Sequence, residues 1–143
     1  MRPNTEFEIN GYKYKTDNQG RIISAEGPIR VEPPHPRERE DVRKMEKQDY
    51  KDTDDKGHLI AHWFGGSDKL ENLIPMDAKL NRGDYNKLEN TLAEAVKDGC
   101  IVSLKVEPLY ESDSTRPSEI RVTYTIDGEK NVTVFKNERE VSL

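Results

Sequence analysis

Strict alternation of apolar and polar side chains marks the last third of the chain. Apolar residues occupy every second position from 120 to 126, and polar residues lie between them (Ile120, Val122, Tyr124 and Ile126 against Arg121, Thr123 and Thr125). This period of two predicts a β-strand with one buried face and one solvated face. Asp127-Gly128 then signals a tight turn, and residues 132–135 predict the returning strand of a C-terminal β-hairpin. Residues 100–106 predict one further strand.

A helical period replaces this alternation between Ala78 and Asp98. Apolar residues recur there at three- and four-residue spacing (Leu80, Leu88, Leu92, Ala95 and Val96), and Gly99 follows as a C-terminal stop. The pattern predicts one continuous helix over 78–98. Before it, residues 56–63 predict a short strand or turn, and residues 72–75 predict a second short strand that we expect Pro75 to end. The middle of the chain is therefore expected to run strand, strand, helix.

Turn signals and prolines organise the first part of the chain. Asn10-Gly11 and residues 17–20 are turn sequences, which predict a small β-hairpin or two short strands. Residues 31–36 are rich in proline and form a linker in which no helix is possible. The mixed-charge run 37–51 predicts either a short helix or a loose arm. We expect an α+β fold, with a hairpin and linker over 1–36 and the main part over 37–143, in one compact domain.

Composition bounds the class of protein. A chain of 143 residues with 32% hydrophobic and 36% charged residues suits one polar domain. No apolar run approaches the roughly 18 residues that span a bilayer, and no signal-peptide pattern follows Met1. We therefore expect no membrane partner, and export by another route or as a fragment of a larger exported chain. Cys100 is the only cysteine, which excludes an internal disulfide and a cysteine-rich zinc site.

The net charge of −5 counts against a high-affinity nucleic-acid-binding module, because phosphate contacts come from Lys and Arg. It counts less against an enzyme, which needs only a locally positive cleft and a metal ion.

His58 is the candidate general base. Hydrolysis of a phosphodiester needs a water deprotonated beside a phosphate, and imidazole is well matched to that task near neutral pH. Gly57 allows a tight backbone there and close approach of a substrate. The alternative is a histidine that merely fills a turn. The flanking residues 55–57 and the later helix favour the catalytic role.

Asn81 is the candidate ligand of a divalent cation. Its amide oxygen is a neutral, hard donor that suits Mg²⁺, with Mn²⁺ as a substitute; the alternative is an ordinary helix N-cap. Glu89 lies eight residues further on. On a continuous helix these positions differ by about 80° around the axis and ~12 Å along it. Glu89 would then reach the same ion only through a bridging water, and otherwise it is a solvated helix glutamate.

Three basic residues are candidates to neutralise the phosphate and the charge of the transition state: Lys56, Arg43 and Arg82. Asp55 and Asn72 are assigned supporting roles.

The other histidines carry less signal. His62 follows His58 by four positions, but Leu59 stands where a helical zinc-protease motif needs glutamate, so no zinc site is expected. We expect His35 to be an ordinary surface residue.

These residues resemble a known family. Asp55-Lys56-Gly57-His58 resembles the Asp-Arg-Gly-His motif of the DNA/RNA non-specific endonucleases, which belong to the ββα-metal (His-Me finger) nucleases. Residues 80–83 with Leu88-Glu89 resemble their Leu-Asn-x-Gly helix and its later glutamate, and residues 71–76 resemble their second strand. The resemblance implies a ββα-metal core with His58 as base, Asn81 as metal ligand and Glu89 as a water-mediated ligand. Lys56 replaces the arginine of the motif and lacks its bidentate fork, so phosphate contact could fall to Arg43 or Arg82.

A branch of this family, the C-terminal toxin domains of secreted bacterial polymorphic toxins, is more similar still. The shared residues are Arg43-x-x-x-x-Gln48, Gly57-His58-Leu59-Ile60, Phe64-Gly65-Gly66, Ser114-x-Arg116-Pro117 and the opening segment 10–22. This resemblance implies an antibacterial toxin that is secreted or delivered into a target bacterial cell and acts in its cytoplasm. It also implies an immunity protein as partner in the producing cell.

Three functions remain open at this point. The first is a Mg²⁺-dependent endonuclease that cuts DNA, with RNA as a second substrate. The second is an RNA-only nuclease, although nothing in the sequence recognises a 2′-hydroxyl. The third is a non-catalytic binding or adaptor domain in which the histidine motif stabilises a turn.

Overall fold

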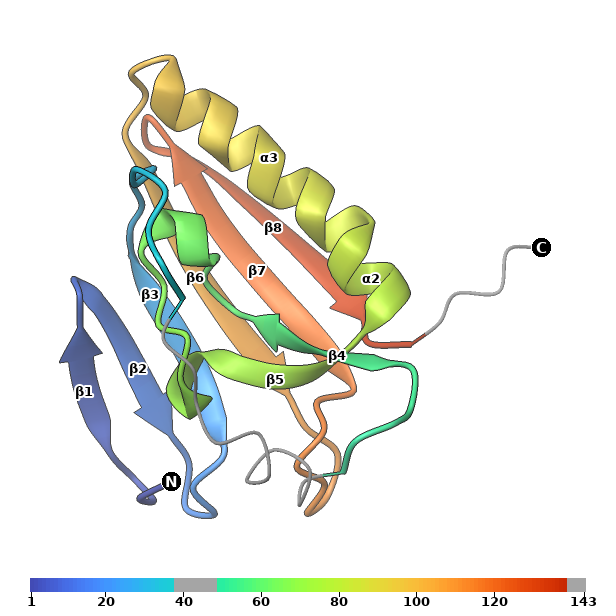
Figure 1. Cartoon of the computed structure of the whole chain (residues 1–143). Coiled ribbons are helices and arrows are strands. Elements are labelled where there is room, and N and C mark those ends of the chain that lie inside the picture. The colour runs from blue at the N-terminus through green and yellow to red at the C-terminus, as the bar shows by residue number, and fades with distance from the viewer. Residues whose placement is uncertain (38–48, 139–143) are drawn as a thin grey trace.

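Two layers build the molecule, and the computed structural model describes them over residues 1–37 and 49–138 (Figure 1). The first layer is an antiparallel six-stranded sheet in the order β1-β2-β3-β6-β7-β8. Its strands are β1 (Glu6–Ile9), β2 (Tyr12–Thr16), β3 (Ile22–Pro28), β6 (Val102–Leu109), β7 (Glu119–Ile126) and β8 (Glu129–Lys136). The predicted C-terminal hairpin is confirmed as β7 and β8.

The second layer lies on one face of this sheet (Figure 1). It contains a two-stranded antiparallel sheet, two short 3-10 helices (η1 and η2) between the strands of that sheet, and the two α-helices that follow it in the chain. Its elements are β4 (Asp54–His58), η1 (His62–Phe64), η2 (Leu70–Asn72), β5 (Leu73–Asp77), α2 (Ala78–Arg82) and α3 (Asp84–Lys97). The predicted order of strand, strand and helix is confirmed, as is the α+β class with a long helix on an antiparallel sheet.

The core fills the space between the layers. Tyr12, Val106 and Ile120 on the six-stranded sheet are fully enclosed, as are Ile60 and Met76 in the second layer. On α3 the apolar stripe predicted from the sequence packs inward, with Leu92 buried and Leu88, Ala95 and Val96 partly buried. Ala93, which the stripe did not include, is buried as well. None of the helices in the described ranges is long and apolar enough to cross a membrane.

The N-terminal segment forms three strands, one more than the sequence predicts, and β3 pairs with β6 along Ala25–Pro28. The N-terminal strands and the C-terminal hairpin therefore belong to a single sheet. Arg43, a candidate for phosphate contact, and Gln48 of the same motif lie outside the described residues, as does most of the mixed-charge run 37–51.

The prediction that Pro75 ends its strand is wrong. Pro75 lies inside β5, opposite Lys56. β5 pairs with β4 alone, and the Pro75 carbonyl accepts a hydrogen bond from Asn137 Nδ2 at 2.9 Å. Because the N and the C=O of a strand residue point to the same side, the missing N–H of Pro75 faces away from β4 and no ladder bond is lost.

The helix predicted over 78–98 is present, but it is not continuous, because Gly83 breaks it into α2 and α3. A side chain at Gly83 would place its Cβ 2.6 Å from the carbonyl oxygen of Lys79, so only glycine fits this close backbone approach. Asn81 and Glu89 consequently stand on two different helices, and the separation calculated for a straight helix does not describe them.

Candidate active site

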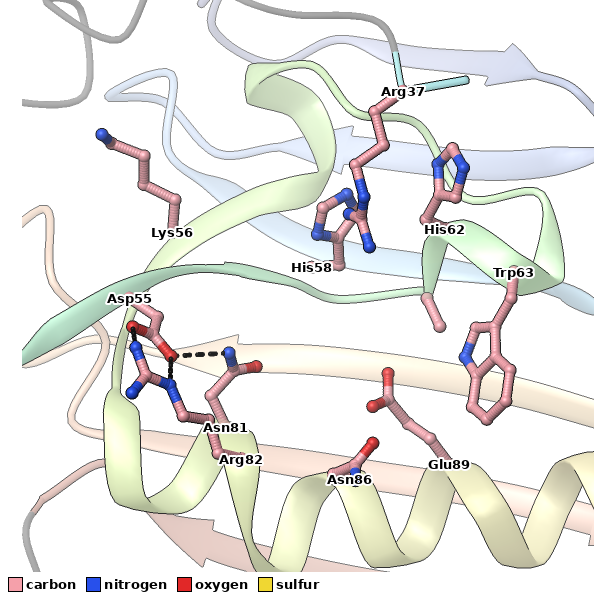
Figure 2. A pocket seen from close by; sticks show the side chains of 11 residues that line it. Arg37, Asp55, Lys56, His58, His62, Trp63, Asn81, Arg82, Asn86 and Glu89 are labelled. Carbon is pink, nitrogen blue, oxygen red and sulfur yellow. Dashed lines mark hydrogen bonds and ion pairs between the residues drawn. The ribbon is translucent and has the colours of Figure 1, made fainter. Parts of the chain in front are cut away.

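A cleft of about 780 Å³ opens between β4, η1 and the two helices (Figure 2). Its walls contain His58 and Lys56 from β4, Asn81 from α2 and Glu89 from α3. The fold therefore brings together, around one space, four of the residues that the sequence nominates for catalysis and metal binding.

His58 is the last residue of β4, and its imidazole is mostly enclosed. Its Nε2 lies 2.7 Å from the Asp68 carboxylate. Burial lowers the pKa of His58 and outweighs the hydrogen bond and charge of Asp68, which oppose it; the positive charge of Arg37 lowers the pKa further. An imidazole with a lowered pKa is neutral at pH 7, which is the form that a general base needs.

Gly57 has a different role from the one predicted. It is buried in β4, and a Cβ there would lie 2.8 Å from Cβ of Met76. The glycine therefore admits a core side chain from β5 rather than a substrate. This packing fixes the strand one residue before His58.

The Asn81 carboxamide is oriented by Asp55. Its Nδ2 donates to Asp55 Oδ2 at 3.0 Å, which turns its oxygen away from Asp55 (Figure 2). Arg82 holds the same carboxylate through Nε at 3.0 Å and Nη2 at 2.7 Å. The N-cap alternative for Asn81 is excluded, because the side chain of Asp77 caps α2 by accepting from Lys79 N and Leu80 N. The Asn81 oxygen is thus available as a donor to a cation.

Glu89 projects from α3 toward the same cleft, with Asn86 one helical turn before it (Figure 2). Burial raises the pKa of Glu89 to about 8, which favours the protonated carboxyl group near neutral pH. A cation in the cleft would favour the ionised form. Asn86 could not be predicted from the sequence, because a lone asparagine on a helix carries no signal of its own.

The basic residues near the cleft differ in whether they already form an ion pair with a carboxylate. Lys56 lines the cleft, whereas Arg82 is committed to Asp55. Arg37 also lines the cleft and lies close enough to His58 to act on its pKa. Arg37 could not be predicted from the sequence, because the proline-rich segment before it gives no indication of which element it will approach.

Asn72 secures the segments on either side of the cleft wall. It is fully buried, its Oδ1 accepts from Ile60 N at 2.9 Å, and its Nδ2 donates to the carbonyls of Ile60 at 2.7 Å and Ser67 at 2.8 Å. Its side chain therefore fastens the turn after His58 to the loop that carries Asp68.

The other two histidines lie beside this wall. His62 lines the cleft and contacts Asp68. His35 was expected to be an ordinary surface residue; it is exposed, but its ring centroid lies 4.1 Å from that of His62, and its Nε2 lies 2.9 Å from Glu32. Within residues 1–37 and 49–138, no three His, Cys, Asp or Glu side chains are grouped to hold a metal ion.

Comparison with protein families identifies a match over nearly the whole chain. A family model described as DNA/RNA non-specific endonuclease matches residues 3–128. The type VII secretion system protein EssD of Staphylococcus aureus strain USA300 is 32% identical over 144 residues, which covers 96% of this chain and 24% of EssD. The chain therefore spans about a quarter of that relative's length. The probable deoxyribonuclease RhsA of Dickeya dadantii is 30% identical over 78 residues, covering 54% of this chain and 5% of RhsA.

Solved structures share the fold. NucA from Streptococcus agalactiae without metal superposes with a TM-score of 0.72 at 18% identity, covering 94% of this chain and 83% of NucA. NucA with a magnesium ion bound gives a TM-score of 0.66 at 16% identity, covering 94% of this chain and 84% of NucA. At these identities the likeness establishes the fold alone.

Proposed function

Because the chain belongs to the DNA/RNA non-specific endonuclease family, we propose that it is a metal-dependent endonuclease that hydrolyses phosphodiester bonds of DNA, with RNA as a second substrate. One observation carries the proposal: His58 on β4 and Asn81 on α2 line the same cleft, one as a neutral imidazole and the other with its amide oxygen turned away from Asp55. A base and a hard oxygen donor around one space are what hydrolysis of a phosphodiester requires.

In this mechanism His58 removes a proton from the attacking water. Its Nε2 faces Asp68, so Nδ1 is the nitrogen that accepts the proton. The side chains of Lys56 and Arg37 place positive charge at the cleft, where the phosphate of the substrate would lie. Such charge stabilises the transition state more than the ground state, because negative charge builds up on the phosphoryl oxygens as the bond breaks.

The residues of the cleft fit a magnesium ion. Asn81 supplies an amide oxygen whose orientation is already fixed, and Glu89 and Asn86 supply further oxygens from α3. Mg²⁺ prefers oxygen ligands and retains several waters, which suits Asn81 as direct ligand and Glu89 through a water. When bound, the ion would supply Lewis-acid stabilisation of charge on the phosphate and on the leaving oxygen. NucA, whose fold this chain shares, has a structure with a magnesium ion bound, which supports a divalent cation as cofactor.

We also propose that the chain acts as a toxin domain in a target bacterial cell. Its relative EssD is by name a protein of the type VII secretion system, and RhsA is by name a probable deoxyribonuclease. A delivered nuclease would endanger the cell that makes it. We therefore propose a cognate immunity protein that blocks the cleft until delivery.

The experiment is digestion of supercoiled plasmid in Mg²⁺, in Mn²⁺ and in EDTA, beside single-stranded and duplex RNA. We expect cutting of DNA in either metal and none in EDTA. Plasmid left intact in both metals, with RNA cut, would replace the proposal with an RNA-only nuclease. If neither substrate is cut, the chain is a binding domain.

Two variants test the residues. We expect His58→Ala to lower kcat by about 10²–10⁴-fold, the usual contribution of a general base. Asn81→Ala is expected to raise the Mg²⁺ concentration for half-maximal cutting at least about ten-fold, as for the loss of a metal-orienting group. Asn90→Ala, an exposed asparagine on α3, is the matched control and should leave both quantities unchanged. Unaltered cutting by His58→Ala would remove His58 from the mechanism.

A further inference from the structure

Asp68 lies between two imidazoles. Its Oδ1 is 2.7 Å from Nε2 of His58, and its two oxygens are each 2.9 Å from Nδ1 of His62. All three side chains are largely enclosed, with exposed fractions of 10% for Asp68, 12% for His62 and 18% for His58. Burying an ionised carboxylate costs free energy unless its oxygens accept hydrogen bonds, so the two imidazoles compensate the burial of Asp68.

The hydrogen-bond pattern fixes which ring nitrogens carry hydrogen. An ionised carboxylate only accepts, so the His58 nitrogen facing it is Nε2–H, and the lone pair of the neutral ring is on Nδ1. His62 faces Asp68 with Nδ1 and the backbone carbonyl of His35 with Nε2, at 3.0 Å. Because an ionised carboxylate only accepts, the His62 nitrogen that faces Asp68 also carries hydrogen.

The loop that carries Asp68 is held by its neighbours. The Ser67 carbonyl accepts from the buried Asn72 amide, and the Ser67 hydroxyl donates to Glu71 at 2.7 Å. The same Asn72 amide also bonds both backbone groups of Ile60, two residues after His58. Asp68 and His58 are therefore fixed relative to each other by the backbone as well as by their own contact.

We propose that Asp68 is the positioning residue of His58: its carboxylate holds the ring with Nδ1 as the base, and His62 clamps that carboxylate from its other side. The inference deepens the proposed function and rests on it, because a base must be present for its tautomer to matter. Without an acceptor at Nε2, the neutral ring would divide between two tautomers and two orientations, and only one of them presents a basic Nδ1 to the cleft.

The first test needs no activity. The chain has three histidines, so long-range ¹H–¹⁵N spectra of the full chain in EDTA resolve each ring. We expect neutral His58 as the Nε2–H tautomer in the wild type. In Asp68→Asn we expect a mixture or the Nδ1–H tautomer, since the new amide can donate as well as accept. A wild-type ring with hydrogen on Nδ1 would overturn the proposal whether or not the protein cuts nucleic acid.

The second test asks whether Asp68 acts through His58. We expect Asp68→Asn to lower kcat on a duplex oligonucleotide by about 10–100-fold, as for the loss of the partner of a functional imidazole, with KM almost unchanged. In a His58→Ala background the same substitution should cost nothing further. Asp52→Asn, at an exposed aspartate just before β4, is the matched control.

Two results would overturn the proposal. One is an unchanged kcat in Asp68→Asn, and the other is an equal loss of kcat from Asp68→Asn in the wild-type and His58→Ala backgrounds. Thermal unfolding of each variant is recorded alongside. If Asp68→Asn does not fold, the proposal is tested by the tautomer of His58 in the wild type and in His62→Asn. This substitution keeps a donor toward Asp68 and should leave the tautomer of His58 as it is; a changed tautomer there would contradict the assigned geometry.

Discussion

The Arg116 guanidinium holds the Asp54 carboxylate in a two-point ion pair, with 2.8 Å from Nε to Oδ2 and 2.8 Å from Nη2 to Oδ1. The Asp54 side chain is completely enclosed and that of Arg116 is 10% exposed. Arg116 also donates to the carbonyl of Asn137 at 2.8 Å. Because Asp54 is the first residue of β4, the pair ties the loop before β7 and the end of β8 to the strand that carries His58.

Removing Arg116 should destabilise the whole fold. We expect Arg116→Ala to lower the free energy of unfolding by about 3–5 kcal/mol, because it leaves a buried carboxylate without its partner. Urea titration measures the change. Arg121→Ala is the matched control, since Arg121 pairs with Glu107 on the sheet surface and is 43% exposed, and it should cost no more than about 1 kcal/mol. Equal losses in the two variants would show that burial of the Asp54 pair contributes nothing.

The same pair should make stability depend on pH. Burial alone would raise the pKa of Asp54, but the hydrogen bond and charge of Arg116 and the backbone N–H of Lys51 outweigh it and lower the pKa. A carboxyl group whose pKa is lower when folded stabilises the protein above its unfolded pKa of about 3.9. That contribution is lost as the pH falls through the folded pKa.

We therefore expect the difference in unfolding free energy between the wild type and Asp54→Asn to narrow as the pH falls from about 5 to below the unfolded pKa of about 3.9. Urea titrations across this range measure it, with Asp52→Asn as the exposed control. A difference that is constant or grows toward acid pH would contradict the lowered pKa of Asp54.

Arg37 and Lys56 should determine the salt dependence of substrate binding. Each lines the cleft, and each phosphate contact that is lost should reduce the slope of log affinity against log salt by about 1. We expect Arg37→Ala and Lys56→Ala to raise KM, to lower kcat and to flatten this slope. Lys97→Ala, at the exposed far end of α3, is the control. An unchanged slope in both variants would place the phosphate elsewhere.

The elements that the sequence predicted are those whose side-chain period is local. The alternation at Ile120 and Val122 suffices to predict the strand β7, and the spacing of Leu88 and Leu92 suffices to predict the helix α3. Each pattern lies within one segment and needs no knowledge of distant contacts. His58 and Asn81 could be nominated for the same reason: each stands in a short motif with its own chemistry.

The residues that were missed depend on contacts between segments. Asp68 is one acid in a polar loop, and only the fold brings it between His58 and His62. Arg37 follows a proline-rich segment whose sequence does not indicate which part of the fold Arg37 will approach. Pro75 was misjudged for a related reason: its effect depends on whether the strand has a partner on both sides, which a sequence does not state.

Gly83 offers the sharpest test of how the helix break serves the site. An alanine Cβ would lie 2.6 Å from the Lys79 carbonyl oxygen, and overpacking of this kind costs about 1–3 kcal/mol. We expect Gly83→Ala to lower the free energy of unfolding by that amount. It should also raise the Mg²⁺ concentration needed for cutting, because Asn81 and Glu89 stand on either side of the break.

Urea titration and Mg²⁺-dependent plasmid cutting measure the two effects of Gly83→Ala, with Asn90→Ala as the control on α3. Alanine is the better helix former by about 1 kcal/mol, so a chain free to run α2 into α3 as one helix would gain stability from the substitution. A stabilised Gly83→Ala variant with an unchanged Mg²⁺ requirement would therefore show that the cleft does not need the break.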